Sequence, residues 1–378
     1  MQKMMENWNY LFTSESVTEG HPDKVCDQIS DAILDACLKE DPYSRVAVEC
    51  LITTNKLIIA WEVTTKANIA YVEIAKNVLK EIWYTSEESW FNPDTADIEV
   101  LIHIQSPDIA QGVDVWGAGD QWIMFWFATN ESESMIPISL EFANNLAFLL
   151  SRARKTWAIP YLYPDGKTQV TIEFNEYWEA KRIDTIVISA QHKAGISQEQ
   201  IRKDIKKHVI DAVHFGIPSN DAKIIINPTG SFVIGGPAGD TWVTGRKIIV
   251  DTYWGWWRHG WGAFSWKDPT KVDRSAAYMA RFLAKNIVDN WFCKKCEIQL
   301  SYAIGVLQPV SIFLEDFWTA WVDKEKIIGY IKEHYDLSPN GIINFLDLRK
   351  PIYKQTAAYG HFWPISYPWE KLEHWEIC

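Results

Sequence analysis

Residues 20–65 read GHPDKVCDQISDAILDACLKEDPYSRVAVECLITTNKLIIAWEVTT. The first half predicts a helix that begins at Pro22 and carries apolar residues on one face: Val25, Ile29, Ile33 and Ala36. The second half contains two runs rich in β-branched residues, 45–54 and 56–65, joined by a short polar turn. This pattern predicts hairpins backed by helices, that is, two-layer α/β units rather than strict βαβ alternation.

The same pattern recurs along the chain. Further strands are expected at 97–104, 167–174, 184–192, 223–227, 247–253, 296–306 and 310–314. Further helices are expected at about 136–154, 197–212, 270–288 and 324–334. Gly-rich stretches around 111–120 and 227–240 indicate the boundaries between units.

Composition narrows the class of protein. The 378 residues carry a net charge of -12, which argues against general nucleic-acid binding. No signal peptide and no run of about 18 apolar residues is present, so we expect a cytoplasmic protein without a membrane partner. The six cysteines are too irregularly spaced for a disulfide framework, and we interpret the CxxC at Cys293 and Cys296 as two ordinary thiols.

Two segments could bind a polyphosphate. His21, Asp23 and Lys24 cluster at a helix start, where free N–H groups and the helix dipole favour anions, although a first-turn acid beside a solvated histidine would look the same. Residues 227–278 combine glycines with basic side chains that include Arg246, Lys247, Lys267 and Lys271. Neither Walker A nor GxGxxG spacing occurs, so the residues alone predict only an anion-binding loop.

A third set consists of acids and amides at or near strand ends: Glu49, Glu62, Gln105 and Asp120. A carboxylate inside an apolar strand is costly unless it is paired or bound to a ligand. An exposed position or a structural ion pair is the alternative for each of them.

A dozen collinear motifs from about residue 10 to 371 resemble S-adenosylmethionine synthetase. They include GHPDK, QSPDIAQGVD, GAGDQ, ATNES, PDGKTQV, INPTG, GRKIIVDTY, KDPTKVDRSAAY and YKQTAAYGHF. The resemblance implies that the sulfur of methionine attacks C5′ of ATP, and that the tripolyphosphate released is then cleaved to phosphate and pyrophosphate. Such a displacement needs positioning and charge neutralisation more than a protein nucleophile.

The resemblance also implies roles for individual residues. His21 assists departure of the 5′ oxygen and, with Lys167, Arg246 and Lys267, forms the catalytic set. The ATP site is completed by Asp165, Phe232, Asp240, Lys247 and Ala263, with Asp120 nearby. The methionine site comprises Glu62, Gln105, Asp240, Lys271 and Ile304. The cofactors implied are Mg²⁺, held by Asp23 and Asp273, and K⁺, held by Glu49.

The family architecture implied is three similar α/β domains around a pseudo-threefold axis. On this chain we expect the domains at 8–110, 117–235 and 236–378. A homodimer or homotetramer with active sites at the subunit interface is implied as well.

Tryptophan is the abnormal feature of the composition, with 21 Trp against 19 Gly, although glycine normally supplies about 7% of residues. Tryptophan stands where the family pattern has glycine at Trp61, Trp83, Trp122, Trp126, Trp242, Trp254, Trp261, Trp266, Trp318 and Trp363, and also at Trp90, Trp157, Trp257 and Trp291. Trp256 and Trp369 match tryptophans of the family. The bulk and strain of ten such insertions should exceed a total stability of about 5–15 kcal/mol. Our hypothesis is that UGA codons specify glycine at these positions.

Two alternatives to an active synthetase remain at this point. If the tryptophans are real, the chain is an inactive homologue that serves as a scaffold or regulatory subunit. A nucleotide-binding module without transfer chemistry is the third class, but it leaves Glu62, Gln105 and the magnesium acids without a purpose. Inspection of the codons separates the active synthetase from the inactive homologue.

Overall fold

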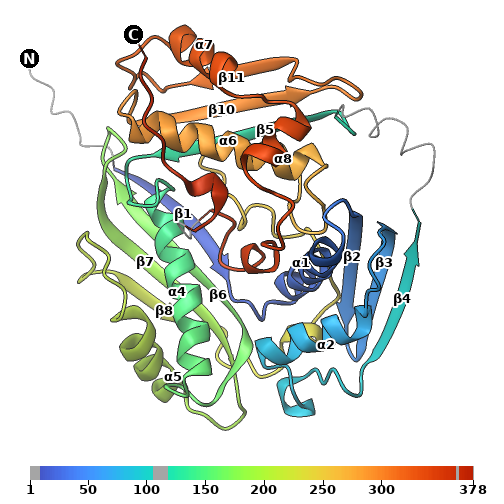
Figure 1. Cartoon of the computed structure of the whole chain (residues 1–378). Helices are drawn as coiled ribbons and strands as arrows, with labels where there is room; N and C mark the ends of the chain where they lie inside the picture. Colours follow the sequence, from blue (N-terminus) through green and yellow to red (C-terminus); the bar gives the residue numbers. More distant parts are fainter. Residues whose placement is uncertain (1–8, 105–117, 363–365, 378) are drawn as a thin grey trace, which may run out of the picture.

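The computed structural model describes residues 9–104, 118–362 and 366–377, and its strands form three sheets arranged around the middle of the molecule (Figure 1). Each sheet is covered by helices on one face. A mixed α/β fold of three helix-backed sheets is therefore confirmed.

The first sheet consists of β4 (Asp97–His103), β3 (Lys56–Thr64), β2 (Arg45–Thr53) and β9 (Trp242–Val243), in this order. β2 and β3 form the antiparallel hairpin that the sequence predicts. Helix α1 (Pro22–Glu40) packs on β2 and β9, and α2 (Tyr71–Ile82) packs on α1 and β4. The apolar face of α1 lies in the core, since Val25, Ile29 and Ile33 are fully buried.

The second sheet has the order β1 (Tyr10–Val17), β6 (Leu162–Phe174), β7 (Ala180–His192) and β8 (Lys223–Ile226). Helix α4 (Ile138–Lys155) packs on β6 and β1. The helix expected at 197–212 is α5 (Gln198–Ile205), continued by a π-helical turn, η2 (Lys206–Ile210), which contacts α4. The sequence analysis did not predict β1, whose partner strand lies about 150 residues further along the chain.

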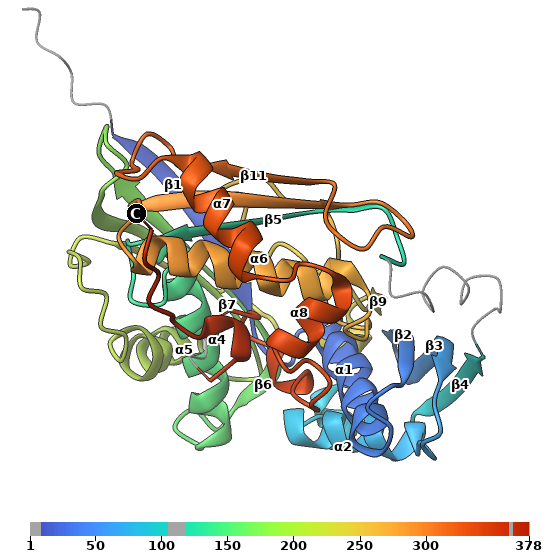
Figure 2. The ribbon, with the colours of Figure 1, turned by 45° about the horizontal axis from the view of Figure 1, so that its top comes forward.

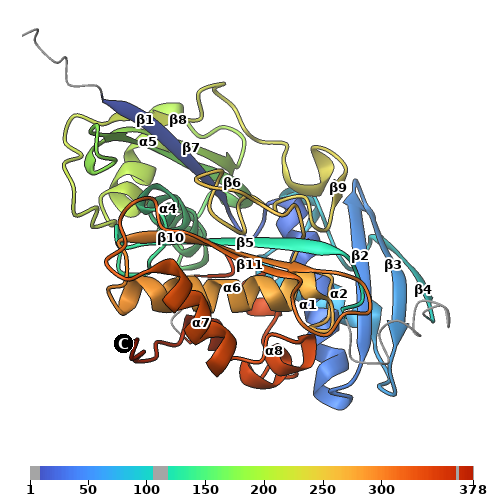
Figure 3. The same ribbon diagram turned by 90° about the horizontal axis from the view of Figure 1, so that it is seen from above.

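The third sheet has the order β11 (Ser311–Glu315), β10 (Lys295–Tyr302) and β5 (Trp122–Thr129). Helix α6 (Val272–Asp289) runs along β5 and β10, as Figures 2 and 3 show. Helix α7 (Lys324–His334) contacts β11, and α8 (Pro339–Phe345) contacts α6. Strand β5 was also missed by the sequence analysis.

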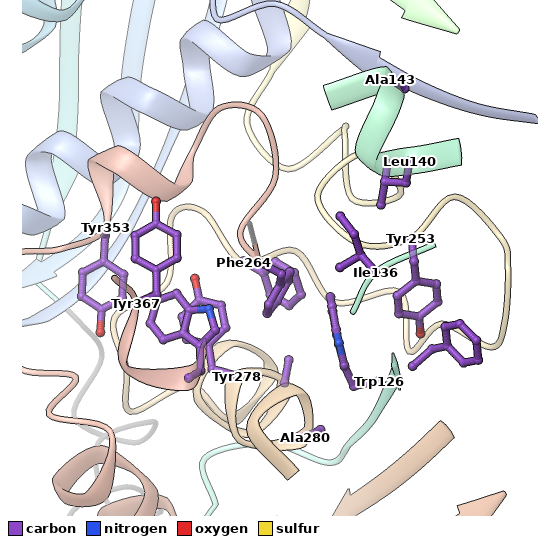
Figure 4. Packing of buried hydrophobic residues seen from close by; sticks show 14 of the residues in the cluster. Trp126, Ile136, Leu140, Ala143, Tyr253, Phe264, Tyr278, Ala280, Tyr353 and Tyr367 are labelled. Carbon is purple, nitrogen blue, oxygen red and sulfur yellow. The ribbon is translucent and has the colours of Figure 1, made fainter. Parts of the chain in front are cut away.

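The C-terminal chain joins the three units. After α8 it coils through the middle of the molecule (Figure 1), where the carboxylate of Glu370 pairs with Arg281 and Lys285 of α6, each at 2.8 Å. Buried aromatic rings surround this segment (Figure 4), and Trp369 stacks on Tyr278 with ring centroids 3.8 Å apart. The core is therefore continuous across the three units.

One strand prediction is wrong. Residues 247–253 form turns rather than a strand. Their β-branched run is overridden by ion pairs, because Lys247 binds Asp23 and Asp251 binds Lys24 at the start of α1. These pairs hold the segment across the helix start instead of along a sheet edge.

Among the residues that the structure describes, no helix is long and apolar enough to cross a membrane. The cysteines within that part of the chain, Cys293 and Cys296 included, are buried and free. The cytoplasmic location stays a prediction.

Candidate active site

The site begins at the start of α1. His21 is the N-cap in extended conformation (φ -61°, ψ 129°), and Pro22 at the first helical position fixes the helix direction. The His21 side chain is 1% exposed, and its Nδ1 has no hydrogen-bond partner. Burial, and then the nearby ammonium groups of Lys247 and Lys167, hold the pKa of His21 well below its ordinary value. A neutral imidazole with a free ring nitrogen therefore faces a cluster of cations.

The basic loop that carries Arg246 and Lys247 crosses this helix start. The Asp23 carboxylate accepts a hydrogen bond from the Val243 N–H at 3.0 Å and pairs with Lys247 Nζ at 2.5 Å. Arg246 is exposed and donates a long hydrogen bond, 3.4 Å, to the Thr241 carbonyl. Asp23, Arg246 and Lys247, predicted from distant motifs, thus lie together.

A buried ion-pair cluster anchors the loop to the helix. Lys24 Nζ lies 2.9 Å from Asp27 and 2.5 Å from Asp251, and all three side chains are at most 2% exposed. Burial alone would lower the pKa of Lys24, but the two carboxylates outweigh this effect and raise it. Asp27 also accepts the Gly245 N–H at 2.8 Å. The sequence analysis gave Asp27 and Asp251 no role, although Asp251 directly follows an apolar run that could have marked it.

Strand β6 contributes two more predicted residues. Lys167 is exposed and lies 3.6 Å from Glu15. Asp165 is buried and accepts the Gly236 N–H at 2.9 Å. Burial raises the pKa of Asp165 to about 6. Since Lys167 and Arg246 both influence the titration of His21, they belong to the same cluster, which we call the His21 cluster: His21, Asp23, Asp165, Lys167, Arg246 and Lys247.

A second group of predicted residues lies at the start of α6. Lys267 Nζ is 3.1 Å from Asp273, both residues are 6% exposed, and the second carboxylate oxygen of Asp273, Oδ1, has no hydrogen-bond partner. Burial lowers the pKa of Lys267 and raises that of Asp273. Lys271 Nζ is held by Asp268 at 2.5 Å.

Two further acids lie near this second group. Burial raises the pKa of Glu49, and the nearby ammonium group of Lys267 offsets part of this rise. Asp120 is close enough to affect the titration of both Lys267 and Asp273. We call the group the Lys267 cluster: Glu49, Asp120, Lys267, Lys271 and Asp273.

The remaining predicted residues are more scattered. Phe232 pairs with His192 through its backbone, and Ala263 lies against Gly245. Glu62 is opposite Ala47, which forms a β-bridge with Lys267. Asp240 and Ile304 are exposed in the single chain. Gln105 lies outside the described residues.

Indole rings occupy both clusters. The Trp242 ring lies 5.0 Å from the His21 ring and 5.6 Å from Lys247 Nζ. The rings of Trp266 and Trp122 lie 4.7 and 5.6 Å from Lys267 Nζ. A cavity of about 20 Å³ between Trp122, Gly262 and Asp273 has room for about one water molecule.

Divalent metal chemistry fits part of this site. In the described part of the chain no three His, Cys, Asp or Glu side chains gather as a metal cage. Mg²⁺ nevertheless commonly uses one or two carboxylates together with substrate phosphates. Asp273 has one carboxylate oxygen free for such a role, whereas Asp23 is paired with Lys247.

Comparison with known protein families covers almost the whole chain. Residues 9–107 match the N-terminal domain of S-adenosylmethionine synthetase, residues 115–232 match its central domain, and residues 234–371 match its C-terminal domain. The three matches follow the domain order of the family, and the matched residues include the start of α1, the basic loop and the start of α6 described above. The chain belongs to the S-adenosylmethionine synthetase family.

Proposed function

We propose that this chain binds the triphosphate of ATP in the His21 cluster. The chain is a methionine adenosyltransferase, which makes S-adenosylmethionine from ATP and methionine and hydrolyses the tripolyphosphate. The observation that carries the proposal is the buried His21 with a free Nδ1, surrounded by Lys167, Arg246 and Lys247. Fixed cations in a partly buried site stabilise developing negative charge far better than water does.

In the reaction the sulfur of methionine forms a bond to C5′ while the C5′–O bond breaks, and the electron pair leaves with the tripolyphosphate. The neutral His21, in the tautomer that carries its proton on Nδ1, would donate a hydrogen bond to the departing oxygen. Lys167, Arg246 and Lys247 neutralise the phosphate charge, which makes tripolyphosphate a better leaving group.

Magnesium would add charge neutralisation on the phosphates, with Asp23 and Asp273 as its protein ligands. The free oxygen of Asp273 supports this assignment. K⁺ would be held near Glu49. The burial that raises the pKa of that carboxylate is the kind of environment in which a bound cation stabilises a charge.

Methionine would bind beside Glu62, Gln105, Asp240, Lys271 and Ile304, with Phe232, Ala263 and Asp120 completing the nucleotide pocket. Asp240 and Ile304 are exposed in the single chain. We therefore propose that a second copy of the chain covers them, as a homodimer or homotetramer with sites at the subunit interface. The three domains proposed, 8–110, 117–235 and 236–378, would each contribute residues to it.

The test of the His21 assignment compares two histidine variants in a chain that carries glycine at the fourteen tryptophan positions identified from the family pattern. His21→Asn should lower kcat about 10²- to 10⁴-fold, the usual contribution of a positioned proton donor. His214→Asn is the control, because His214 is exposed and lies in the loop between η2 and β8, outside both clusters as defined above. Methionine-dependent release of phosphate and pyrophosphate is measured; equal rates in the two variants would rule out the role of His21.

A further inference from the structure

Tryptophan in this chain occupies backbone conformations that bulky residues avoid. Of its 21 tryptophans, three lie outside the described residues, Trp8, Trp116 and Trp363. Ten of the others have positive φ angles between 52° and 109°: Trp61, Trp83, Trp90, Trp157, Trp178, Trp254, Trp261, Trp266, Trp291 and Trp318. For a bulky side chain each such angle is an outlier.

The other aromatic residues provide an internal control. Of the 16 phenylalanines only Phe317 has a positive φ, and of the 15 tyrosines only Tyr359 does. Gly112 and Gly117 lie outside the described residues, and eight of the remaining 17 glycines have one. In its backbone conformation, tryptophan therefore behaves like glycine and unlike an aromatic residue.

Two helix ends show why glycine is required. Trp83 directly follows α2, and Trp291 follows the C-cap residue Asn290 of α6; their φ angles are 75° and 61°. In both, the tryptophan N–H bonds to the carbonyl three residues back at 3.0 Å, and the next N–H bonds to the carbonyl five residues back, at 3.0 Å for α2 and 3.2 Å for α6. This is the Schellman motif, whose left-handed position is normally glycine.

The hairpin between β6 and β7 repeats the requirement. Trp178 N–H donates to the Asn175 carbonyl at 3.0 Å, and Asn175 N–H donates to the Glu179 carbonyl at 3.0 Å. Trp178 is left-handed, with φ 61°, at the point where the chain enters β7. Hairpin loops of this length place glycine there. The comparison with the family pattern did not identify this position.

Packing gives a second, independent observation. The buried indole N–H groups of Trp126, Trp242, Trp254 and Trp257 have no hydrogen-bond partner, which is unfavourable for a donor removed from water. Trp375 shares this feature, but it lies beyond the family match, which ends at residue 371, and it packs against Tyr330 and Tyr335.

Trp256 and Trp369 behave as genuine tryptophans. Their φ angles are ordinary and they are 7% and 0% exposed. The Trp256 indole donates to Ser139 Oγ at 3.1 Å, and the Trp369 indole donates to the His361 carbonyl at 2.9 Å. Two populations of tryptophan therefore coexist in one chain.

We propose that the protein made in its own cells carries glycine at the ten positive-φ tryptophan positions, because the ribosome there decodes UGA as glycine, and tryptophan at Trp256 and Trp369. The family pattern adds Trp122, Trp126, Trp242 and Trp257 to the first set, and the unpaired buried N–H groups of the last three agree with this. The inference rests on backbone geometry and packing, and it is independent of the catalytic roles proposed above.

The test is peptide mass spectrometry of the protein purified from its native cells. Peptides that contain positions 178 and 291 are expected to be lighter by the mass difference between tryptophan and glycine. Peptides that contain positions 256 and 369 are expected to keep tryptophan and serve as matched controls. The gene should show UGA at the first two positions and UGG at the last two.

Tryptophan masses at positions 178 and 291, or UGG codons there, would overturn the proposal. Glycine at 291 with tryptophan at 178 would overturn it too, because it would show that backbone angle is not what separates the two populations. Neither readout depends on enzyme activity, so a failure of the proposed catalytic roles would be recognised separately.

Discussion

The replacement Trp318→Gly should stabilise a parent chain that carries glycine at the other thirteen tryptophan positions of the family pattern. Trp318 is 99% exposed and has φ 60°, and Phe317 before it has φ 52°. Two consecutive left-handed residues form a turn that favours Asn-Gly. Because the indole contacts almost nothing, its removal costs no burial and releases the strain of the left-handed backbone.

The magnitude follows from two opposing effects. A non-glycine residue in the left-handed region costs about 1–2 kcal/mol. Glycine also gives the unfolded chain more conformational freedom, which lowers the free energy of unfolding by about 0.4–1 kcal/mol. The net gain is about 1 kcal/mol, which corresponds to a rise in Tm of about 1 °C for a chain of this size.

The matched control is Trp321→Gly. Trp321 is 62% exposed and has an ordinary φ, so there is no strain to release and the added freedom of glycine remains. Its Tm should fall slightly. Thermal unfolding by calorimetry at one scan rate compares both variants with the parent. A Tm for Trp318→Gly at or below that of Trp321→Gly would refute the reasoning.

Three further outcomes are expected. Lys24→Met should lower the free energy of unfolding, measured in urea, by about 3–5 kcal/mol, since it leaves two buried carboxylates unpaired. Lys56→Met, which removes a surface ion pair, should lower it by less than about 1 kcal/mol. Equal losses in the two variants would contradict the role of the buried ion pairs. The pKa of Asp165 is raised to about 6 from an unfolded value near 3.8, so its contribution to stability is present below pH 4 and declines as pH rises to 6. Asp165→Asn should remove that decline, worth at most about 3 kcal/mol, and an unchanged profile of Tm against pH would contradict it. Chelation of divalent cations should abolish S-adenosylmethionine formation, and full activity in excess chelator would exclude a metal-dependent site.

The longest helices were the most predictable part of the fold, whereas the shorter helices α2 and α8 were not predicted. The periodic apolar residues of α1 and α6 are sufficient because the pattern is local. Strand β1 was missed, since it becomes a strand only by pairing with β6 far along the chain. The segment 247–253 was wrongly predicted as a strand, because a β-branched run carries no information about the ion pairs that Lys247 and Asp251 make.

The site was predictable to a similar degree. The family motifs identified His21, Lys167 and Arg246, which the fold brings into one cluster. They did not identify Asp27, whose role depends on the loop that folds over it. Likewise Trp178 was missed, because a left-handed hairpin position is defined by backbone geometry rather than by a motif.

The most direct test of the account measures S-adenosylmethionine, phosphate and pyrophosphate formed from ATP and methionine by a folded chain with glycine at the fourteen family positions and at position 178. We predict equal amounts of the three products, all dependent on methionine. A chain that is folded by calorimetry and yet turns over no ATP with methionine would contradict the central claim that this protein is an active methionine adenosyltransferase.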